Sequence, residues 1–148
     1  MGDNRIKINE NAPALARKEI MIDADPESVW NVLIDIEHWP KWNPDVENVK
    51  MDHDFVEGSE FKWKAGPGTI TSKLQVVDKP KLLVWTGKTM GIHAVHVWSL
   101  KPSKGQTMIS SEESWEGLIV RILSGRMQKT LEKSTESGLK YLKQEIEK

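Results

Sequence analysis

The sequence predicts an α+β fold in which one antiparallel sheet of about seven strands packs against a long C-terminal helix. Apolar residues alternate with polar ones between Val46 and Gly117, which is the strand period, and turn residues interrupt this stretch at short intervals. Beyond Gly117, apolar residues recur at helical spacing to about Glu147. A chain of 148 residues is the size of one domain. We therefore expect a polar tail over residues 1–13 and a single domain over residues 14–148.

The first strand and the short helices after it are predicted from the start of this domain. Leu15–Asp23 ends in apolar, β-favouring residues, which indicates a strand. Asp25 and Pro26 follow, and these residue types cap a helix and occupy its first turn. Pro40 and Pro44 then break the helical path. Two short helices, or a helix and a turn, are expected between the first strand and the rest of the sheet.

Six further strands and one final helix complete the predicted order. The turns between these strands are expected at Glu57-Gly58, Gly66-Pro67-Gly68, Asp78-Lys79-Pro80, Thr89-Met90-Gly91 and Lys101 to Gly105. The final helix is predicted as one continuous element from Gly117 to about Glu147. Its apolar stripe would comprise Ile119, Ile122, Leu123, Met127, Leu131, Ser134, Gly138, Leu142 and Ile146.

The tryptophans of the sheet are predicted to share one face. Short turns fix which residues face one another, and they predict these pairs: Trp63 with Ile70, Leu74 with Trp85, Trp85 with Ala94 and Trp98 with Ile109. One face then collects Trp63, Leu74, Trp85, His96, Trp98, Glu113 and Trp115, while the other is polar and typical of a solvated surface. Large rings pack less readily than branched aliphatics, so we interpret the first face as the wall of an internal cavity of several hundred Å³. The alternative is that the rings fill a wide gap between a curved sheet and the helix.

Glu113 and His96 are the candidate chemical groups on this face, and no catalytic residue is assigned. They lie on neighbouring strands, near enough for a diagonal contact. Burial beside indoles would raise the pKa of Glu113, and a protonated His96 would oppose that shift. The pair could act as general acid and base or hold a polar group of a ligand. The alternative is that the two side chains satisfy each other structurally or lie at a wet edge of the sheet.

Composition and charge exclude several other classes. There is no cysteine for a disulfide or thiolate, and His93 and His96 point to opposite faces of a strand, so no metal and no cofactor are expected. The net charge of −1 argues against nucleic-acid binding. No apolar run approaches a membrane span, so no membrane insertion is expected. Met1–Asn11 is polar and lacks the apolar stretch of a secretory signal, which predicts a cytoplasmic protein. We expect this protein to be a monomer or a homodimer.

Two segments resemble a known superfamily. The stretch IMIDADPESVWNVLIDIEHWPKWNPDV (Ile20–Val46) and the late strand pair VHVWSLKPSKGQTMISSEESWEG (Val95–Gly117) are similar to the START-type, birch-allergen-like helix-grip superfamily, in particular the polyketide cyclase/dehydrase and lipid-transport group often called SRPBCC. The resemblance implies a curved sheet gripping the long helix around a deep hydrophobic cavity. The cavity position transfers to Trp63, Trp85, His96, Trp98, Glu113, Trp115, Met127 and Leu131.

Three functions follow from the residues and this resemblance together. The first is binding or carrying of a hydrophobic, ring-containing or lipid-like small molecule between the sheet and the C-terminal helix. The second is a cofactor-independent cyclase or dehydratase that uses Glu113 and His96 as acid and base. The third is a protein-interaction module, because some relatives contact chaperones or ribosomes through outer surfaces.

Overall fold

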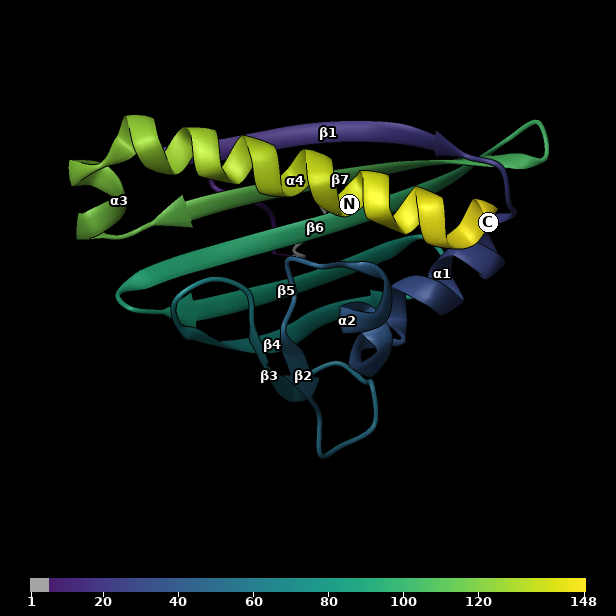
Figure 1. The fold of residues 1–148 in the computed structure, drawn as a ribbon, viewed down its shortest axis with the longest axis horizontal. Coiled ribbons are helices and arrows are strands. Elements are labelled where there is room, and N and C mark those ends of the chain that lie inside the picture. The colour runs from purple at the N-terminus through teal and green to yellow at the C-terminus, as the bar shows by residue number, and fades with distance from the viewer. Residues whose placement is uncertain (1–5) are drawn as a thin grey trace, which may run out of the picture.

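A computed structural model describes residues 6–148, and Figure 1 shows their arrangement. The strands are β1 (Ala14–Ile22), β2 (Asn48–Lys50), β3 (Glu60–Lys64), β4 (Thr69–Asp78), β5 (Leu82–Thr89), β6 (Ile92–Ser103) and β7 (Gln106–Glu116). The helices are α1 (Pro26–Ile34), the 3-10 helix η1 (Ile36–His38), α2 (Trp39–Trp42), α3 (Leu118–Ile122) and α4 (Ser124–Glu147). None of the helices in this part of the chain is long and apolar enough to cross a membrane.

The seven strands form one antiparallel sheet in the order β1-β7-β6-β5-β4-β3-β2. The long helix α4 lies across one face of this sheet and packs mainly along β1, while α1 and α2 cover one end of the same face (Figure 1). Asp25 caps α1 by accepting a hydrogen bond from the Ser28 N–H, and Pro26 opens the first turn, as predicted. The predicted α+β helix-grip architecture is confirmed.

The register of the hairpins agrees with the prediction in part. Trp63 faces Ile70 and Leu74 faces Trp85, as expected. The other two predicted pairs are wrong by two positions, because Trp85 faces His96 rather than Ala94, and Trp98 faces Ser111 rather than Ile109.

The two wrong pairs have one cause, because each turn is centred one residue later in the sequence than predicted. Thr89 pairs with Ile92, so the loop between β5 and β6 contains only Met90 and Gly91, both with positive φ. The loop between β6 and β7 likewise closes over two residues with positive φ. Two-residue loops of this kind match the twist of a hairpin. Moving the centre of a turn by one residue shifts the pairing by two, which keeps the side chains of β6 and β7 on their predicted faces.

The continuous C-terminal helix expected from Gly117 is wrong. The chain forms the short helix α3, leaves helical geometry at Leu123 (φ −106°, ψ 35°) and then begins α4. Val120 is fully buried against a cluster that includes Ala14 and Leu131, whereas Ile122, part of the predicted stripe, is 69% exposed. The break reverses the chain from the end of β7 onto the sheet while keeping Val120 in contact with β1.

The buried stripe of α4 is offset from the predicted one, because it includes Thr135 and Leu139 in place of Ser134 and Gly138. Its buried side chains are Leu131, Thr135, Leu139 and Leu142. Ser134, which was expected on this stripe, is exposed.

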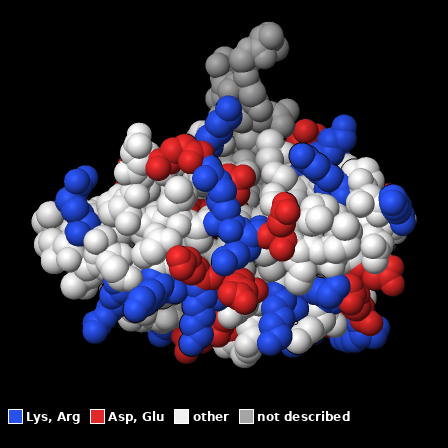
Figure 2. Space-filling view, turned by 90° about the horizontal axis from the view of Figure 1, so that it is seen from above, with Lys and Arg blue, Asp and Glu red and all other residues white. Residues whose placement is uncertain are grey.

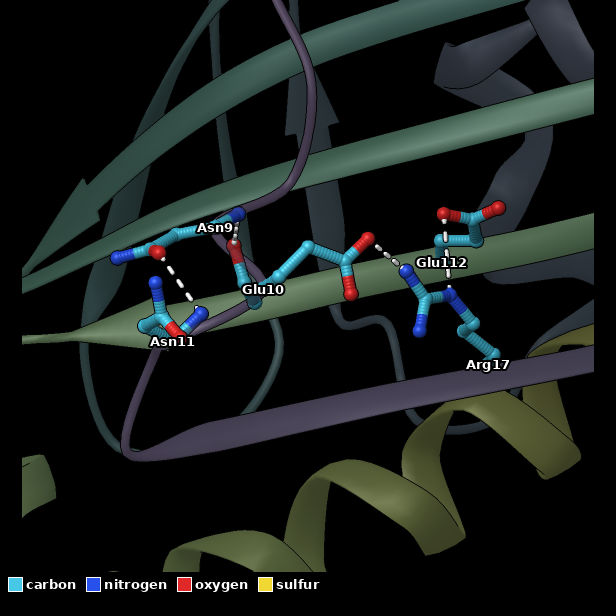
Figure 3. A network of polar contacts seen from close by, with 6 residues as sticks. Asn9, Glu10, Asn11, Arg17 and Glu112 are labelled. Atoms are coloured by element: carbon cyan, nitrogen blue, oxygen red, sulfur yellow. Dashed lines mark hydrogen bonds and ion pairs between the residues drawn. The ribbon is translucent and has the colours of Figure 1, made fainter.

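The outer face of the sheet was expected to be solvated, but its centre is apolar and covered. Ile8 is buried there in a cluster with Val76, Val84 and Val95. The Asn9 N–H donates to Ser114 Oγ over 3.1 Å. Figure 3 shows Arg17 reaching both Glu10 and Glu112 on this face, the latter over 3.4 Å. Residues 6–12 therefore form a strap that removes the apolar centre of the outer face from water.

Gly117 is predicted to be the most sensitive glycine of this scaffold. It has φ +134°, and a Cβ at this position would lie 2.3 Å from the Gly91 carbonyl oxygen. Gly117→Ala should lower the free energy of unfolding by about 2 kcal/mol or more. Gly138→Ala is the matched control, because a Cβ there meets nothing within 4 Å, and it should raise stability by about 0.5–1 kcal/mol. Urea unfolding measures both, and equal shifts would contradict the close approach at Gly117.

Candidate functional site

Five aromatic side chains cover the centre of the inner face, and we call them the aromatic wall: Trp39, Phe61, Trp63, Trp85 and Trp98. The ring centroids of Trp39 and Trp63 are 5.5 Å apart, as are those of Trp39 and Trp85. Trp85 and Trp98 are separated by 6.2 Å. Trp39 comes from α2 and was missed as a candidate site residue, since its helical spacing indicates only that it is buried. The predicted gathering of Trp63, Trp85 and Trp98 on one face is confirmed.

The rings of the aromatic wall pack on one another instead of surrounding an open space. Trp85 is 3% exposed, and Leu74 and Leu83 beside it are fully buried. Two hollows are found elsewhere in the described structure. The first, of about 470 Å³, lies at the β5–β6 turn beside Met90 and His93. The second, of about 220 Å³, lies on the outer face under the strap. Neither hollow lies between the sheet and α4. This closed packing agrees with the alternative in which the rings fill the gap, and a ligand would have to displace them.

The remaining predicted residues gather beside the aromatic wall in a second cluster. Trp115, Met127 and Leu131 pack together with Val120 at the α3 end of the sheet. The two clusters meet at His96 and Glu113, which face each other directly rather than diagonally across β6 and β7. The predicted set is thus split between two clusters, with its polar pair at their junction.

A chain of polar contacts joins this pair to its neighbours. The Trp115 indole N–H donates to Glu113 Oε2 over 2.8 Å, and Glu113 Oε1 lies 3.3 Å from His96 Nδ1. His96 Nε2 lies 2.7 Å from the buried hydroxyl of Ser111. Among residues 6–148, no three His, Asp or Glu side chains gather as a metal ion would require. The polar groups that the inner face offers are thus the proton donors and acceptors of His96, Glu113 and Ser111.

Burial keeps both members of the pair close to their neutral forms. Loss of water contacts raises the pKa of Glu113 to about 7, although the hydrogen bond from Trp115 opposes this shift. Burial lowers the pKa of His96 to about 3. The 3.3 Å separation is longer than the roughly 2.7–2.9 Å of a charge-assisted bond, which fits a neutral contact. Near neutral pH, Glu113 therefore exchanges between its protonated and ionised forms beside an uncharged imidazole.

Trp98 carries a donor that the rest of the described chain leaves unused. Its side chain is 7% exposed and stacks on His96, with ring centroids 4.6 Å apart and planes 22° apart. Its Nε1 is buried and has no hydrogen-bond partner among residues 6–148. A buried donor without an acceptor costs about 1–3 kcal/mol. The strand period predicts the face of Trp98 but gives no information on its partners, so this donor could not be found from the sequence.

The raised pKa of Glu113 predicts a specific pH dependence of stability. An unfolded glutamate ionises near its ordinary pKa of 4.5, whereas folded Glu113 keeps its proton to about 7. The folded state therefore binds more protons in this range, and the contribution of Glu113 to stability falls as the pH rises from about 4.5 to about 7. His96 acts oppositely: its contribution is lost as the pH falls from 6.5 towards 3, because only the unfolded chain binds the proton.

The variant Glu113→Gln isolates the glutamate from the histidine. Its free energy of unfolding relative to the unmodified protein should rise between pH 4.5 and 7, by up to about 3 kcal/mol, and level off above that range. Glu112→Gln on the opposite face, beside Arg17, is the matched control. Urea unfolding across pH measures the difference, and parallel curves for Glu113→Gln and the unmodified protein would contradict the neutral, buried carboxyl.

Solved structures share this fold over nearly the whole chain. A hypothetical protein of Helicobacter pylori matches with a TM-score of 0.83 and 18% identity, covering 99% of this chain and 97% of that one. A START superfamily protein of Mycobacterium smegmatis matches with a TM-score of 0.70 and 17% identity, covering 90% and 97%. An aromatase/cyclase of a Streptomyces species matches with a TM-score of 0.76 and 15% identity, covering 90% and 93%. At such identities these similarities establish the fold alone.

The sequence itself identifies the family. No curated protein sequence matches the chain. The profile of the family described as polyketide cyclase / dehydrase and lipid transport, in contrast, matches residues 13–147. This match spans both clusters of the inner face and all the secondary structure. The chain therefore belongs to the polyketide cyclase/dehydrase and lipid-transport family, as its two resembling segments predicted.

Proposed function

We propose that this protein binds a hydrophobic, ring-containing small molecule between the sheet and α4. The observation that carries the proposal is the unpartnered indole N–H of Trp98, buried in the aromatic wall beside His96. A face selected for stability alone would favour aliphatic side chains and would satisfy each buried donor. The description of the family, which names polyketides and lipids, supports a ligand of this class.

The polar groups restrict what the ligand offers. Trp98 Nε1 donates only, and Glu113 in its protonated form also donates, so both groups suit an oxygen acceptor such as a ketone or phenol. The uncharged imidazole of His96 and the indole rings around it disfavour an ionised ligand. The proposed contact residues are the predicted set: Trp63, Trp85, His96, Trp98, Glu113, Trp115, Met127 and Leu131. Binding would require the rings of the aromatic wall to separate, with the ligand replacing their mutual contacts.

Flavone, a neutral ring ketone, tests this proposal by quenching of tryptophan fluorescence. Trp98→Phe keeps a ring but removes the donor, so it should weaken flavone binding roughly tenfold. Trp42→Phe is the control, since Trp42 packs at the edge of the core from α2. Equal affinities for Trp98→Phe and the unmodified protein, or equal losses in both variants, would contradict the proposed contact.

A second candidate function is cyclisation with loss of water from a polyketone. It is favoured by the pKa of Glu113, about 7, because a general acid or base works best when its pKa is near the working pH. Ionised Glu113 would take a proton from the carbon next to one ketone, that carbon would attack a second ketone to close the ring, and Glu113 would return the proton to the new alkoxide. Transfer of a second proton from the same carbon through Glu113 to the departing hydroxyl would then release water. His96, whose pKa is about 3, would position the carboxyl and would not act as the base. The family description, which includes cyclases and dehydrases, is compatible with this reaction.

The two candidate functions are separated by Glu113→Gln. With a β-polyketone analogue as substrate, mass spectrometry would detect a cyclic product that has lost water. If the protein is an enzyme, Glu113→Gln should abolish this product while flavone binding stays within about twofold, and Glu112→Gln should preserve both. Absence of the product in the unmodified protein, together with intact flavone binding, would leave the binding function and reject the enzymatic one.

A further inference from the structure

A cluster of exposed apolar side chains lies at one end of the molecule, and we call it the α3 patch. It comprises Leu118, Ile119, Ile122 and Leu123. Leu118 is 74% exposed and Ile122 69%. Exposed apolar patches of this kind mark interaction surfaces.

The anchoring of α3 explains why these side chains point outward. Within this helix only Val120 is buried, packed against Ala14, Ala16 and Leu131. The helix lies at the end of the long axis of the molecule, beyond the sheet (Figure 1). The exposed apolar side chains of α3 can therefore contact another surface while the polar side chains of α4 stay in water.

The charge around the α3 patch is mainly basic. Arg121, Arg126 and Lys129 lie between residues 117 and 131, and one acidic residue flanks this stretch at each end, Glu116 and Glu132. All three basic residues are exposed, and none forms an ion pair within the described residues. Figure 2 shows pale surface and basic groups at the left end, where α3 lies, while acidic groups gather nearer the middle and the right. The net charge of the whole chain hides this local excess.

We propose that the α3 patch docks this protein onto an anionic lipid bilayer. Leu118 and Ile122 would enter the boundary between headgroups and acyl chains, and Arg121, Arg126 and Lys129 would face the lipid phosphates. Apolar side chains flanked by basic ones are the chemistry of interfacial anchoring, and each basic residue near an anionic surface strengthens it. This docking departs from the expectation of no membrane insertion drawn from the whole sequence, and it does not rest on the proposed ligand.

Sedimentation with lipid vesicles tests the docking. The full chain should sediment with vesicles of phosphatidylcholine and phosphatidylglycerol, and much less with phosphatidylcholine alone. Added salt should weaken the binding, because it screens the basic residues. Absence of sedimentation with the anionic vesicles, or equal binding to both compositions, would overturn the proposal.

Two pairs of variants assign the binding to the patch. Leu118→Ser with Ile122→Ser should reduce vesicle binding roughly tenfold or more, as should Arg121→Gln with Arg126→Gln. Their melting temperatures should stay unchanged, because all four side chains are exposed. Val56→Ser is the apolar control, since Val56 is 53% exposed elsewhere. Lys62→Gln with Lys73→Gln on the outer face is the charge control.

The controls also distinguish other occupants of the patch. Equal losses in the patch variants and in the controls would overturn the assignment to α3. Light scattering measures self-association in parallel. In the other outcome, the unmodified protein forms a dimer and fails to bind vesicles. If Leu118→Ser with Ile122→Ser dissociates that dimer, the patch is a contact between copies, and the proposal of bilayer docking is overturned.

Discussion

The packing of α4 along β1 is the contact on which the rest of the inner face depends. Leu131, Leu139 and Leu142 are buried almost completely, and they hold the helix over one edge of the sheet. Because one helix is narrower than seven strands, the far strands must be covered in another way. Long planar side chains from α2, β3, β5 and β6 meet this need. The rings of the aromatic wall thus cover the strands that α4 does not reach.

The inner face also contains polar groups whose burial lowers the stability of the fold. A buried carboxyl, a buried imidazole and an unpaired indole N–H each cost free energy that a uniform apolar core would not lose. All three lie where the aromatic wall meets the cluster under α3. Such a concentration of unfavourable groups at one place is typical of functional sites, which retain strain and polarity at the expense of stability.

The fold and the placement of the site were largely predictable because they depend on periodicity. A two-residue alternation assigns Trp63, Trp85 and Trp98 to one face even when the register is wrong by two. Details that depend on three-dimensional contacts were not predictable. The break at Leu123 reflects the path that the chain takes from β7, and the contribution of Trp39 reflects how α2 sits on the sheet. Whether rings enclose a space or fill it depends on their rotamers, which no sequence pattern specifies.

The burial of the outer face was missed for a related reason. The strand period places Val84 and Val95 outward, whereas Val76 reaches the same face through the β-bulge between Leu74 and Val76. The strap then buries all three beneath Ile8. Contacts between residues so far apart in the sequence have no local signal.

These long-range contacts also impose an order on how the protein can be assembled during synthesis. β1 pairs with β7, so the first strand of this domain has no neighbour in the sheet until the last strand has been synthesised. The strap likewise cannot form its contact before then, since the Asn9 N–H donates to Ser114 on β7. Until then the apolar residues of β1 have no partner strand, and pairings of this separation form slowly. The N-terminal segments of this domain are therefore among the last to reach their native positions.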